Sequence, residues 1–171
     1  SQDTFIAGWY LKNTDICDSL IELWNNSNTE QGTVNIKGNT VVDKNFKESV
    51  ELKINPSAQN IFFHKYVEEL KLVATEYIKK YPWSNEFSPW SIIDSVNIQY
   101  YPPGGGFKSW HTERSSGQQP FASRHLVFMT YLNDVYDEGG TEFYHQKQII
   151  QPKKGLTVIW PADWTYTHRG I

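Results

Sequence analysis

The amino-acid sequence predicts a mainly β fold of the α+β class, a β-sandwich or jelly roll with a supporting layer of N-terminal helices. Helical patterns are confined to the first half of the chain, and short apolar segments separated by turns fill the second half. Aromatic residues make up 15% of the chain, and they favour strands and a large apolar core over a helical bundle. A length of 171 residues suits one core, so we expect residues 1–171 to form a single domain.

Two amphipathic segments predict the helices. The first begins at Ile16, after Thr14 or Asp15 as its capping residue, and its apolar face extends to Trp24. The second is longer and covers residues 57–80, where apolar residues recur at helical spacing. Its apolar stripe consists of Phe63, Tyr66, Val67, Leu70, Val73, Ala74, Tyr77 and Ile78.

Alternating or continuous apolar segments predict the strands. Two of them precede the long helix, at residues 5–11 and around residues 50–54. The others lie at residues 92–101, 126–132, 142–144, 148–151 and 156–160. Turns rich in Gly and Pro separate these strands, at residues 102–106, 137–140 and 152–155. The polar segments 29–45 and 114–121 are expected to be flexible loops and are candidate lids.

Composition and charge narrow the class of protein. A net charge of −3 offers no basic excess for nucleic acid, so no nucleic-acid partner is expected. The single cysteine, Cys17, excludes an internal disulfide framework and a cysteine-based zinc site, and it favours a reducing compartment such as the cytoplasm. No apolar run approaches the length of a membrane span, so no association with a membrane is expected. The oligomeric state is not predicted by these features.

The segment His111-Thr112-Glu113 is a candidate metal site. Alternate residues of an extended strand point the same way, so His111 and Glu113 can converge on one ion. His168, on a later strand, could supply a third ligand. Two histidines and one carboxylate form a facial triad, which leaves open positions on a non-haem Fe(II) that activates dioxygen. The spacing alone fits an ordinary polar strand as well, and zinc accepts the same ligand types.

Four segments provide the context that distinguishes these alternatives. They are residues 99–113 (QYYPPGGGFKSWHTE), 124–134 (RHLVFMTYLND), 139–143 (GGTEF) and 152–161 (PKKGLTVIWP), the last followed by His168-Arg169-Gly170. In order and spacing they resemble the 2-oxoglutarate- and Fe(II)-dependent dioxygenases, specifically the prolyl 4-hydroxylase-like branch. The resemblance covers roughly residues 91–171, and it implies a double-stranded β-helix with iron at its open end.

The resemblance also implies an activity and a set of residues for it. His111, Glu113 and His168 would bind Fe(II), with 2-oxoglutarate as co-substrate and ascorbate as a possible further cofactor. The implied reaction is hydroxylation of a C–H bond, and the substrate class is a peptide or protein that contains proline. Free proline and other small metabolites remain alternatives, because the loops that select the substrate vary within one fold.

Four further residues are candidates for binding co-substrate and substrate. Tyr101 and Tyr131 match tyrosines of the family that contact 2-oxoglutarate, and core packing is the alternative for both. Arg124 matches a basic residue near the mouth of the site, where it would meet the peptide; a solvated surface charge is the alternative. Trp110, next to His111, is a candidate to border the substrate path, or it fills the core.

Two departures from the family pattern affect the predicted site. The carboxylate ligand is Glu113 where the family has aspartate, and its additional methylene could alter metal loading. The family also places a Lys or Arg after the second metal-binding histidine to anchor 2-oxoglutarate, whereas the sequence stops at Ile171. We therefore expect the domain to lack its last strand here, with Arg124 or Arg169 as alternative anchors. A catalytically silent peptide-binding jelly roll and a zinc-binding cupin-like protein are the competing hypotheses.

Overall fold

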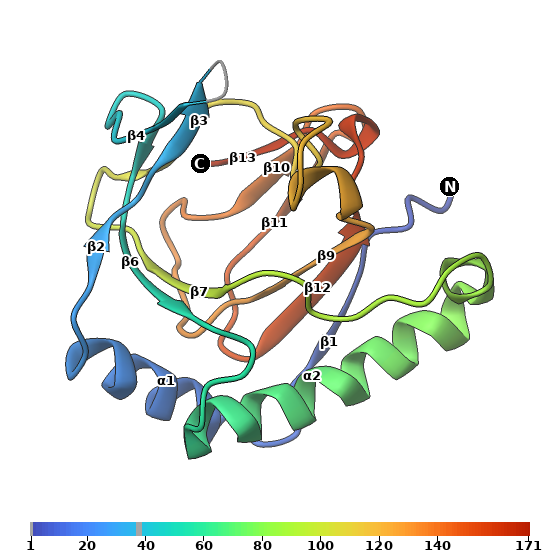
Figure 1. Ribbon diagram of the computed structural model, residues 1–171, viewed down its shortest axis with the longest axis horizontal. Coiled ribbons are helices and arrows are strands. Elements are labelled where there is room, and N and C mark those ends of the chain that lie inside the picture. Colours follow the sequence, from blue (N-terminus) through green and yellow to red (C-terminus); the bar gives the residue numbers. More distant parts are fainter. Residues whose placement is uncertain (1, 37–38) are drawn as a thin grey trace.

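The computed structural model describes residues 2–36 and 39–171, and it has helices in the first half and a run of short strands in the second (Figure 1). The helices are α1 (Asp15–Asn25) and α2 (Ile61–Lys80). The strands are β1 (Ala7–Tyr10), β2 (Glu30–Gln31), β3 (Val34–Ile36), β4 (Asn39–Val41), β5 (Lys47–Glu48), β6 (Val50–Ile54), β7 (Val96–Tyr100), β8 (Gly106–Phe107), β9 (Leu126–Thr130), β10 (Thr141–Phe143), β11 (Gln148–Ile150), β12 (Leu156–Pro161) and β13 (His168–Gly170). Short 3-10 helices lie at Pro82–Asn85, Phe121–Ser123 and Trp164–Tyr166.

Strand β12 is the centre of the first sheet, with β1 and β9 antiparallel on its two sides. Successive side chains of a strand point to opposite faces, and β12 is buried on both. Ile159 packs with the helices, whereas Val158 and Trp160 pack on the opposite face of the sheet. The sequence of this strand, apolar except for Thr157, therefore reflects its place in the middle layer of the molecule.

The two helices form the outer layer and cover one side of the sheets (Figure 1). Helix α2 packs through aromatic contacts: the ring of Tyr77 lies edge-on to Trp9 of β1 at 6.4 Å, and Tyr66 lies 6.4 Å from Phe128 of β9. Asn60 determines where α2 begins, because its side-chain oxygen accepts hydrogen bonds from the backbone N–H groups of the second and third helical residues. The helix thus starts at residue 61, four residues later than the sequence pattern indicates.

The second sheet has β10 at its centre, between β11 and β13. Its inner face meets the first sheet through Phe143, which is fully buried and lies edge-on to Trp160 with ring centroids 5.1 Å apart. Ile6 and Tyr166 complete this inner core. The metal-ligand candidate His168 belongs to β13 and points into the same space, so the two sheets position it.

The third sheet consists of β2, β6 and β7 in that order, and its buried residues Ile54, Val96 and Ile98 share the core with the helices. Next to it β5 pairs with β8, which leads directly toward His111. The expectation of a flexible loop at residues 29–45 is wrong for residues 30–31, 34–36 and 39–41, because β2 pairs with β6 and β3 forms a hairpin with β4. Lys37 and Gly38 of that segment fall outside the described residues.

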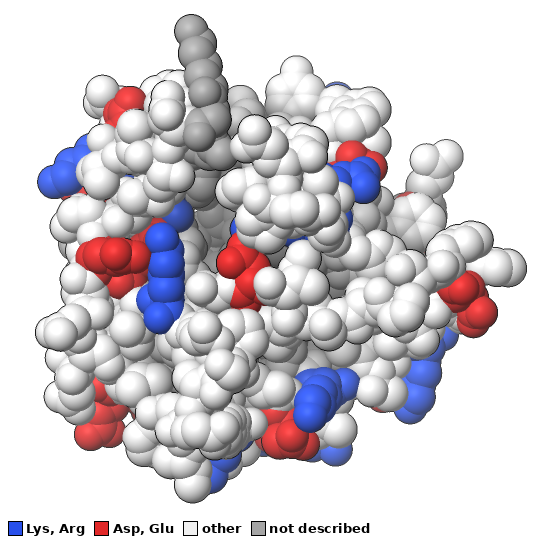
Figure 2. All heavy atoms as spheres, viewed as in Figure 1, with Lys and Arg blue, Asp and Glu red and all other residues white. Residues whose placement is uncertain are grey.

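Within residues 2–36 and 39–171, no helix combines the length and the apolar composition that crossing a membrane requires. Figure 2 shows one face of the molecule, on which acidic and basic side chains are interspersed. The same face is hollowed near its centre, with charged groups of both signs at the edge of the hollow (Figure 2).

Candidate metal centre

His111, Glu113 and His168 converge on one point between the sheets. The two histidines form an antiparallel bridge, in which each backbone N–H donates to the other's carbonyl at 3.0 and 2.9 Å. Oε1 of Glu113 lies 3.2 Å from Nε2 of His168 and 3.6 Å from Nε2 of His111. All three ligand atoms lie within 4.8 Å of one another. The structure therefore brings the three predicted residues together, although His111 lies in an isolated bridge rather than within a long strand.

Backbone carbonyls determine which nitrogen each imidazole offers. Nδ1 of His111 lies 2.8 Å from the carbonyl oxygen of Ser109, and Nδ1 of His168 lies 2.9 Å from that of Tyr166. A carbonyl oxygen only accepts hydrogen bonds, so each Nδ1 carries the proton and donates it. Each neutral ring consequently has its lone pair on Nε2, directed toward Glu113, as metal-binding histidines require.

The protonation states of the ligands also favour a cation. Burial lowers the pKa of His111 to about 4, and the neighbouring His168 adds to this effect. Burial alone would raise the pKa of Glu113, but the proximity of His168, His111 and Arg124 outweighs it and lowers the pKa to about 2. At neutral pH the centre therefore presents a neutral His111 and an ionised carboxylate, and both are ready to coordinate without first losing a proton.

Aromatic side chains hold the two imidazoles in place. Phe107 of β8 stacks on His111, with ring centroids 3.6 Å apart and an interplanar angle of 8°. The ring of His168 lies against Trp160 at 5.2 Å and against Phe143 at 5.5 Å. These contacts limit rotation of both rings and reduce the reorganisation that binding an ion would cost.

The donor set fits a divalent transition metal. Imidazole nitrogens and carboxylate oxygens bind such ions at about 2.0–2.2 Å, so ligand atoms on one ion are separated by roughly 3–4 Å. The separations of 3.2 and 3.6 Å at Glu113 Oε1 lie in this range. Two histidines and one carboxylate on one side of an ion are typical of non-haem Fe(II), and the set leaves further positions open.

Comparison with known proteins assigns this site to a family. Residues 96–170, which include all three candidate ligands, match the family model described as the 2OG-Fe(II) oxygenase superfamily. These residues belong to that superfamily. The match favours the oxygenase hypothesis over the silent binding domain and the zinc-binding cupin-like protein. No curated protein sequence matches the chain.

Solved structures with a similar fold support the same architecture. A prolyl-4-hydroxylase from Pseudomonas putida is similar with a TM-score of 0.70 at 15% identity, over 97% of this chain and 84% of that one. A viral collagen prolyl hydroxylase from Paramecium bursaria Chlorella virus-1, solved as a 2OG complex, gives 0.63 at 16% identity, over 98% and 88%. A prolyl hydroxylase from Trichoplax adhaerens, in complex with a peptide fragment of hypoxia inducible factor, gives 0.68 at 12% identity, over 96% and 76%. The predicted double-stranded β-helix is thereby confirmed.

The two candidate co-substrate tyrosines lie near each other, and Tyr101 is within electrostatic reach of Glu113. The hydroxyl of Tyr101 donates to Oε1 of Gln99 at 2.7 Å. Burial and the negative charges of Glu51 and Glu113 raise the pKa of Tyr101. The hydroxyl of Tyr131 lies 2.6 Å from Oγ1 of Thr141, and burial raises its pKa to about 12. Both phenols therefore remain protonated at neutral pH and can donate hydrogen bonds to a carboxylate.

A buried charged cluster next to these residues is absent from the sequence predictions. Glu51 is only 1% exposed, and its carboxylate lies 2.5 Å from the ammonium group of Lys47, which is 7% exposed. Ser49, Asn97 and Gln99 also donate to this carboxylate, at 2.9, 2.9 and 3.2 Å. The alternation of Lys47, Ser49 and Glu51 places three polar side chains on one face, but only the structure reveals that this face points inward.

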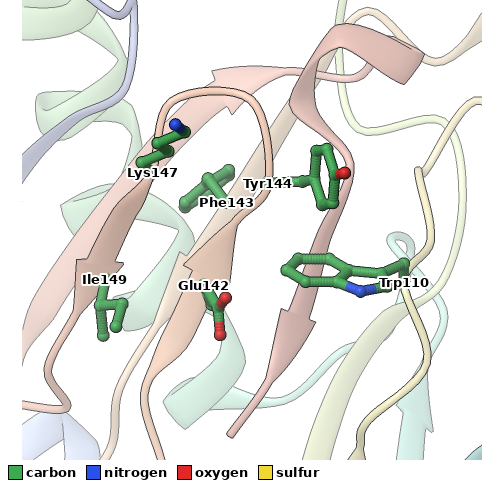
Figure 3. A pocket seen from close by; sticks show the side chains of 6 residues that line it. All are labelled: Trp110, Glu142, Phe143, Tyr144, Lys147 and Ile149. Atoms are coloured by element: carbon green, nitrogen blue, oxygen red, sulfur yellow. The ribbon is translucent and has the colours of Figure 1, made fainter.

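The two candidate substrate residues lie on different sides of the metal centre. The guanidinium of Arg124 contacts Asp94 and Glu113, so it lies beside the metal ligands. Trp110 points away from them, because neighbours in an extended segment face opposite sides. Its indole lies edge-on to Tyr144 at 5.1 Å and beside Glu142 (Figure 3). The guanidinium of Arg169 packs over the indole ring at 4.3 Å. Whether either residue touches a substrate stays a prediction.

Proposed function

We propose that this oxygenase hydroxylates a prolyl residue in a peptide or protein, with Fe(II) held by His111, Glu113 and His168 and with 2-oxoglutarate as co-substrate. The observation that carries the proposal is the convergence of two Nε2 atoms and one carboxylate oxygen within 4.8 Å. The bound iron would supply the oxidising chemistry: one oxygen atom of O₂ enters the substrate C–H bond, and the other enters succinate as 2-oxoglutarate loses CO₂.

The protein's part in this reaction is to bind the metal ion and to orient its ligands. The carbonyl groups of Ser109 and Tyr166 keep the Nε2 lone pairs of the two histidines directed at the ion. Glu113 supplies one negative charge, which partly neutralises the cation. No side chain of the centre is required as a general base, because the proton inventory of the reaction balances between substrate, O₂ and 2-oxoglutarate.

Tyr101 and Tyr131 are the proposed ligands of 2-oxoglutarate. Their raised pKa values keep both hydroxyl groups protonated, and a protonated phenol donates to a carboxylate with a charge-assisted hydrogen bond. Tyr101 is linked through Gln99 to the buried carboxylate of Glu51, which fixes the amide so that its oxygen faces the phenol. A phenol has a single O–H proton, so Tyr101 would donate to 2-oxoglutarate by exchanging its hydrogen bond to Gln99 for one to the co-substrate carboxylate.

The proline-containing substrate rests on fold similarity and on the family resemblance of the sequence. The three solved structures are named as prolyl hydroxylases, and one of them holds a peptide fragment. Trp110 and Arg124 are the proposed contacts for the peptide. We also propose a cytoplasmic location, which fits Cys17 as a buried free thiol in the helix-facing core.

Succinate release measures the proposed activity directly. The purified protein would be incubated with Fe(II), 2-oxoglutarate, ascorbate and O₂, with peptides that contain proline and matched peptides that contain alanine instead. We expect succinate to form and the proline peptides to gain 16 Da. His111→Ala should abolish both signals, whereas His64→Ala should not, because His64 lies on the exposed side of α2.

Two results would overturn parts of this proposal separately. Undiminished turnover in His111→Ala would refute the iron assignment. Substrate-dependent succinate release with the alanine peptides, at the rate seen with proline peptides, would refute the prolyl substrate and leave the oxygenase activity intact.

A further inference from the structure

The guanidinium of Arg124 is held by two acidic residues rather than by solvent. Nη2 donates to Oδ2 of Asp94 at 2.9 Å, and Nη1 donates to the backbone carbonyl of Glu113 at 3.0 Å. Nη1 also lies 3.5 Å from Oε2 of Glu113, which is the carboxylate oxygen that does not face the histidines. The planar group packs over the ring of Phe121 at 4.7 Å, and the side chain is 26% exposed.

The two oxygens of Glu113 therefore have different surroundings. Oε1 faces Nε2 of His111 and Nε2 of His168, and Oε2 faces Arg124. A glutamate has one more side-chain torsion than an aspartate, so its carboxylate can swing away from an ion or exchange its oxygens unless another group restrains it. A guanidinium is suited to this restraint, because its donors form a rigid planar fork.

We propose that Arg124 is a positioning residue for the metal ligand Glu113: it anchors Oε2 and thereby presents Oε1 to the ion, which compensates for the longer side chain of a glutamate. The inference rests on the proposed metal centre. It assigns Arg124 a function that does not depend on any substrate. Asp94 and the backbone of Glu113 hold the guanidinium, so the anchor is itself braced.

The neighbouring Arg114 provides a matched control. It is the next residue after Glu113, but its guanidinium pairs with Asp163 at the surface and has no contact with a metal-ligand candidate among the described residues. Replacing either arginine removes one positive charge from the vicinity of Glu113. Only the replacement of Arg124 also removes the contact with Oε2.

A double-mutant cycle on metal affinity tests the inference without relying on turnover. Co(II) binding to the metal-free protein would be measured anaerobically through the visible absorption of bound Co(II), for the wild type, Arg124→Gln, Glu113→Asp and the double variant. Groups that orient metal ligands typically contribute about 10–100-fold to affinity, so Arg124→Gln should weaken Co(II) binding about tenfold or more. Arg114→Gln should change the affinity by less than about twofold.

The aspartate background distinguishes anchoring of the carboxylate from other effects of Arg124. The shorter side chain withdraws the second oxygen from Nη1, while the contact to the backbone carbonyl remains available. Adding Arg124→Gln to Glu113→Asp should therefore weaken binding by less than about threefold. An equal loss in both backgrounds would overturn the inference, as would an Arg124→Gln variant that binds within twofold of the wild type.

A wrong assignment of the metal centre would give a different result from a wrong inference about Arg124. If the wild type does not bind Co(II), or if His111→Ala binds as well as the wild type, the proposed centre itself is wrong. Circular dichroism of each metal-free variant reports whether it folds. If Arg124→Gln does not fold, Arg124→Lys takes its place in the cycle with the same expected inequality, because a lysine keeps the charge but cannot contact Asp94 and Oε2 in one plane.

Discussion

Replacing Glu51 by glutamine should strongly destabilise the protein, because it leaves the ammonium group of Lys47 buried without its anionic partner. Both side chains are almost inaccessible, with exposed fractions of 1% for Glu51 and 7% for Lys47. The glutamine retains one acceptor oxygen, whereas the carboxylate accepts from Lys47, Ser49, Asn97 and Gln99. The new amide group would also direct its own donors at these donors.

The expected decrease in the free energy of unfolding follows from these contacts. Removing one partner of a buried ion pair costs about 3–5 kcal/mol, mostly because the remaining charge is uncompensated. For a protein of this size, such a change lowers Tm by roughly 6–20 °C. Lys47→Met should cost less, about 1.5–3 kcal/mol, because Glu51 keeps its three neutral donors after the ammonium group is removed.

Urea unfolding at pH 7, followed by circular dichroism, measures the free energy of unfolding of each variant. Glu68→Gln is the matched control: Glu68 pairs with Lys71 on the exposed surface of α2, where an ion pair contributes less than about 1 kcal/mol. A loss of stability below 1 kcal/mol in Glu51→Gln would contradict the cost expected for a buried, unpaired Lys47. A larger loss in Lys47→Met than in Glu51→Gln would contradict the expected order of the two variants.

The same variant should change how stability depends on pH. Burial raises the pKa of Glu51, but its contacts with Lys47, Asn97 and Ser49 outweigh burial and lower the pKa below its usual value of 4.5. A carboxyl whose pKa is lower in the folded state stabilises the protein above the unfolded pKa, and this contribution is lost as the pH falls through the folded value. The difference in stability between wild type and Glu51→Gln should therefore shrink below about pH 4.5; a difference that stays constant to pH 3 would contradict it.

Three further predictions concern the co-substrate site and the two sheets. Tyr101→Phe should weaken 2-oxoglutarate binding to the Co(II)-loaded protein about tenfold, through the loss of one hydrogen bond to a carboxylate, and calorimetric titration would detect this; unchanged affinity would exclude the proposed contact. Phe143→Ala should lower the free energy of unfolding by about 3–5 kcal/mol, since the ring is fully buried between the sheets, and a loss below 1 kcal/mol in urea would contradict that packing. Gly140→Ala should destabilise by about 1–3 kcal/mol, because a Cβ there would lie 2.6 Å from the carbonyl oxygen of Ile150. Gly117→Ala, where a Cβ meets nothing within 4 Å, is its control.

Local patterns in the sequence were sufficient for most of the fold. Apolar spacing identifies α1, α2 and the main strands, because the backbone geometry of a helix or strand fixes which nearby side chains share a face. Element ends are less well predicted: α2 begins at residue 61 because Asn60 caps it, and residues 30–31, 34–36 and 39–41 pair into strands despite the polar composition of the segment. Both outcomes depend on hydrogen-bond partners that helical or strand periodicity does not encode.

The candidate metal ligands were predictable for a related reason. His111 and Glu113 share a face of one extended segment, and the surrounding Gly-rich and Tyr-Leu-Asn segments relate this pair to His168. The family resemblance therefore indicates which distant residues come together, which spacing alone does not show. The structure adds the orientation of the imidazoles, since the carbonyls of Ser109 and Tyr166 are brought to Nδ1 only by the local turns.

The sequence by itself determined the two helices and the main strands, and it identified the triad of metal-ligand candidates and the two candidate co-substrate tyrosines. Only the tertiary structure decided that Lys47 and Glu51 face inward, that Trp110 faces away from the metal centre, and that Arg124 contacts Glu113. The physical reason is register. A shift of one residue in strand pairing exchanges the inward and outward faces, and the pairing that selects between them is made by strands far apart in the chain.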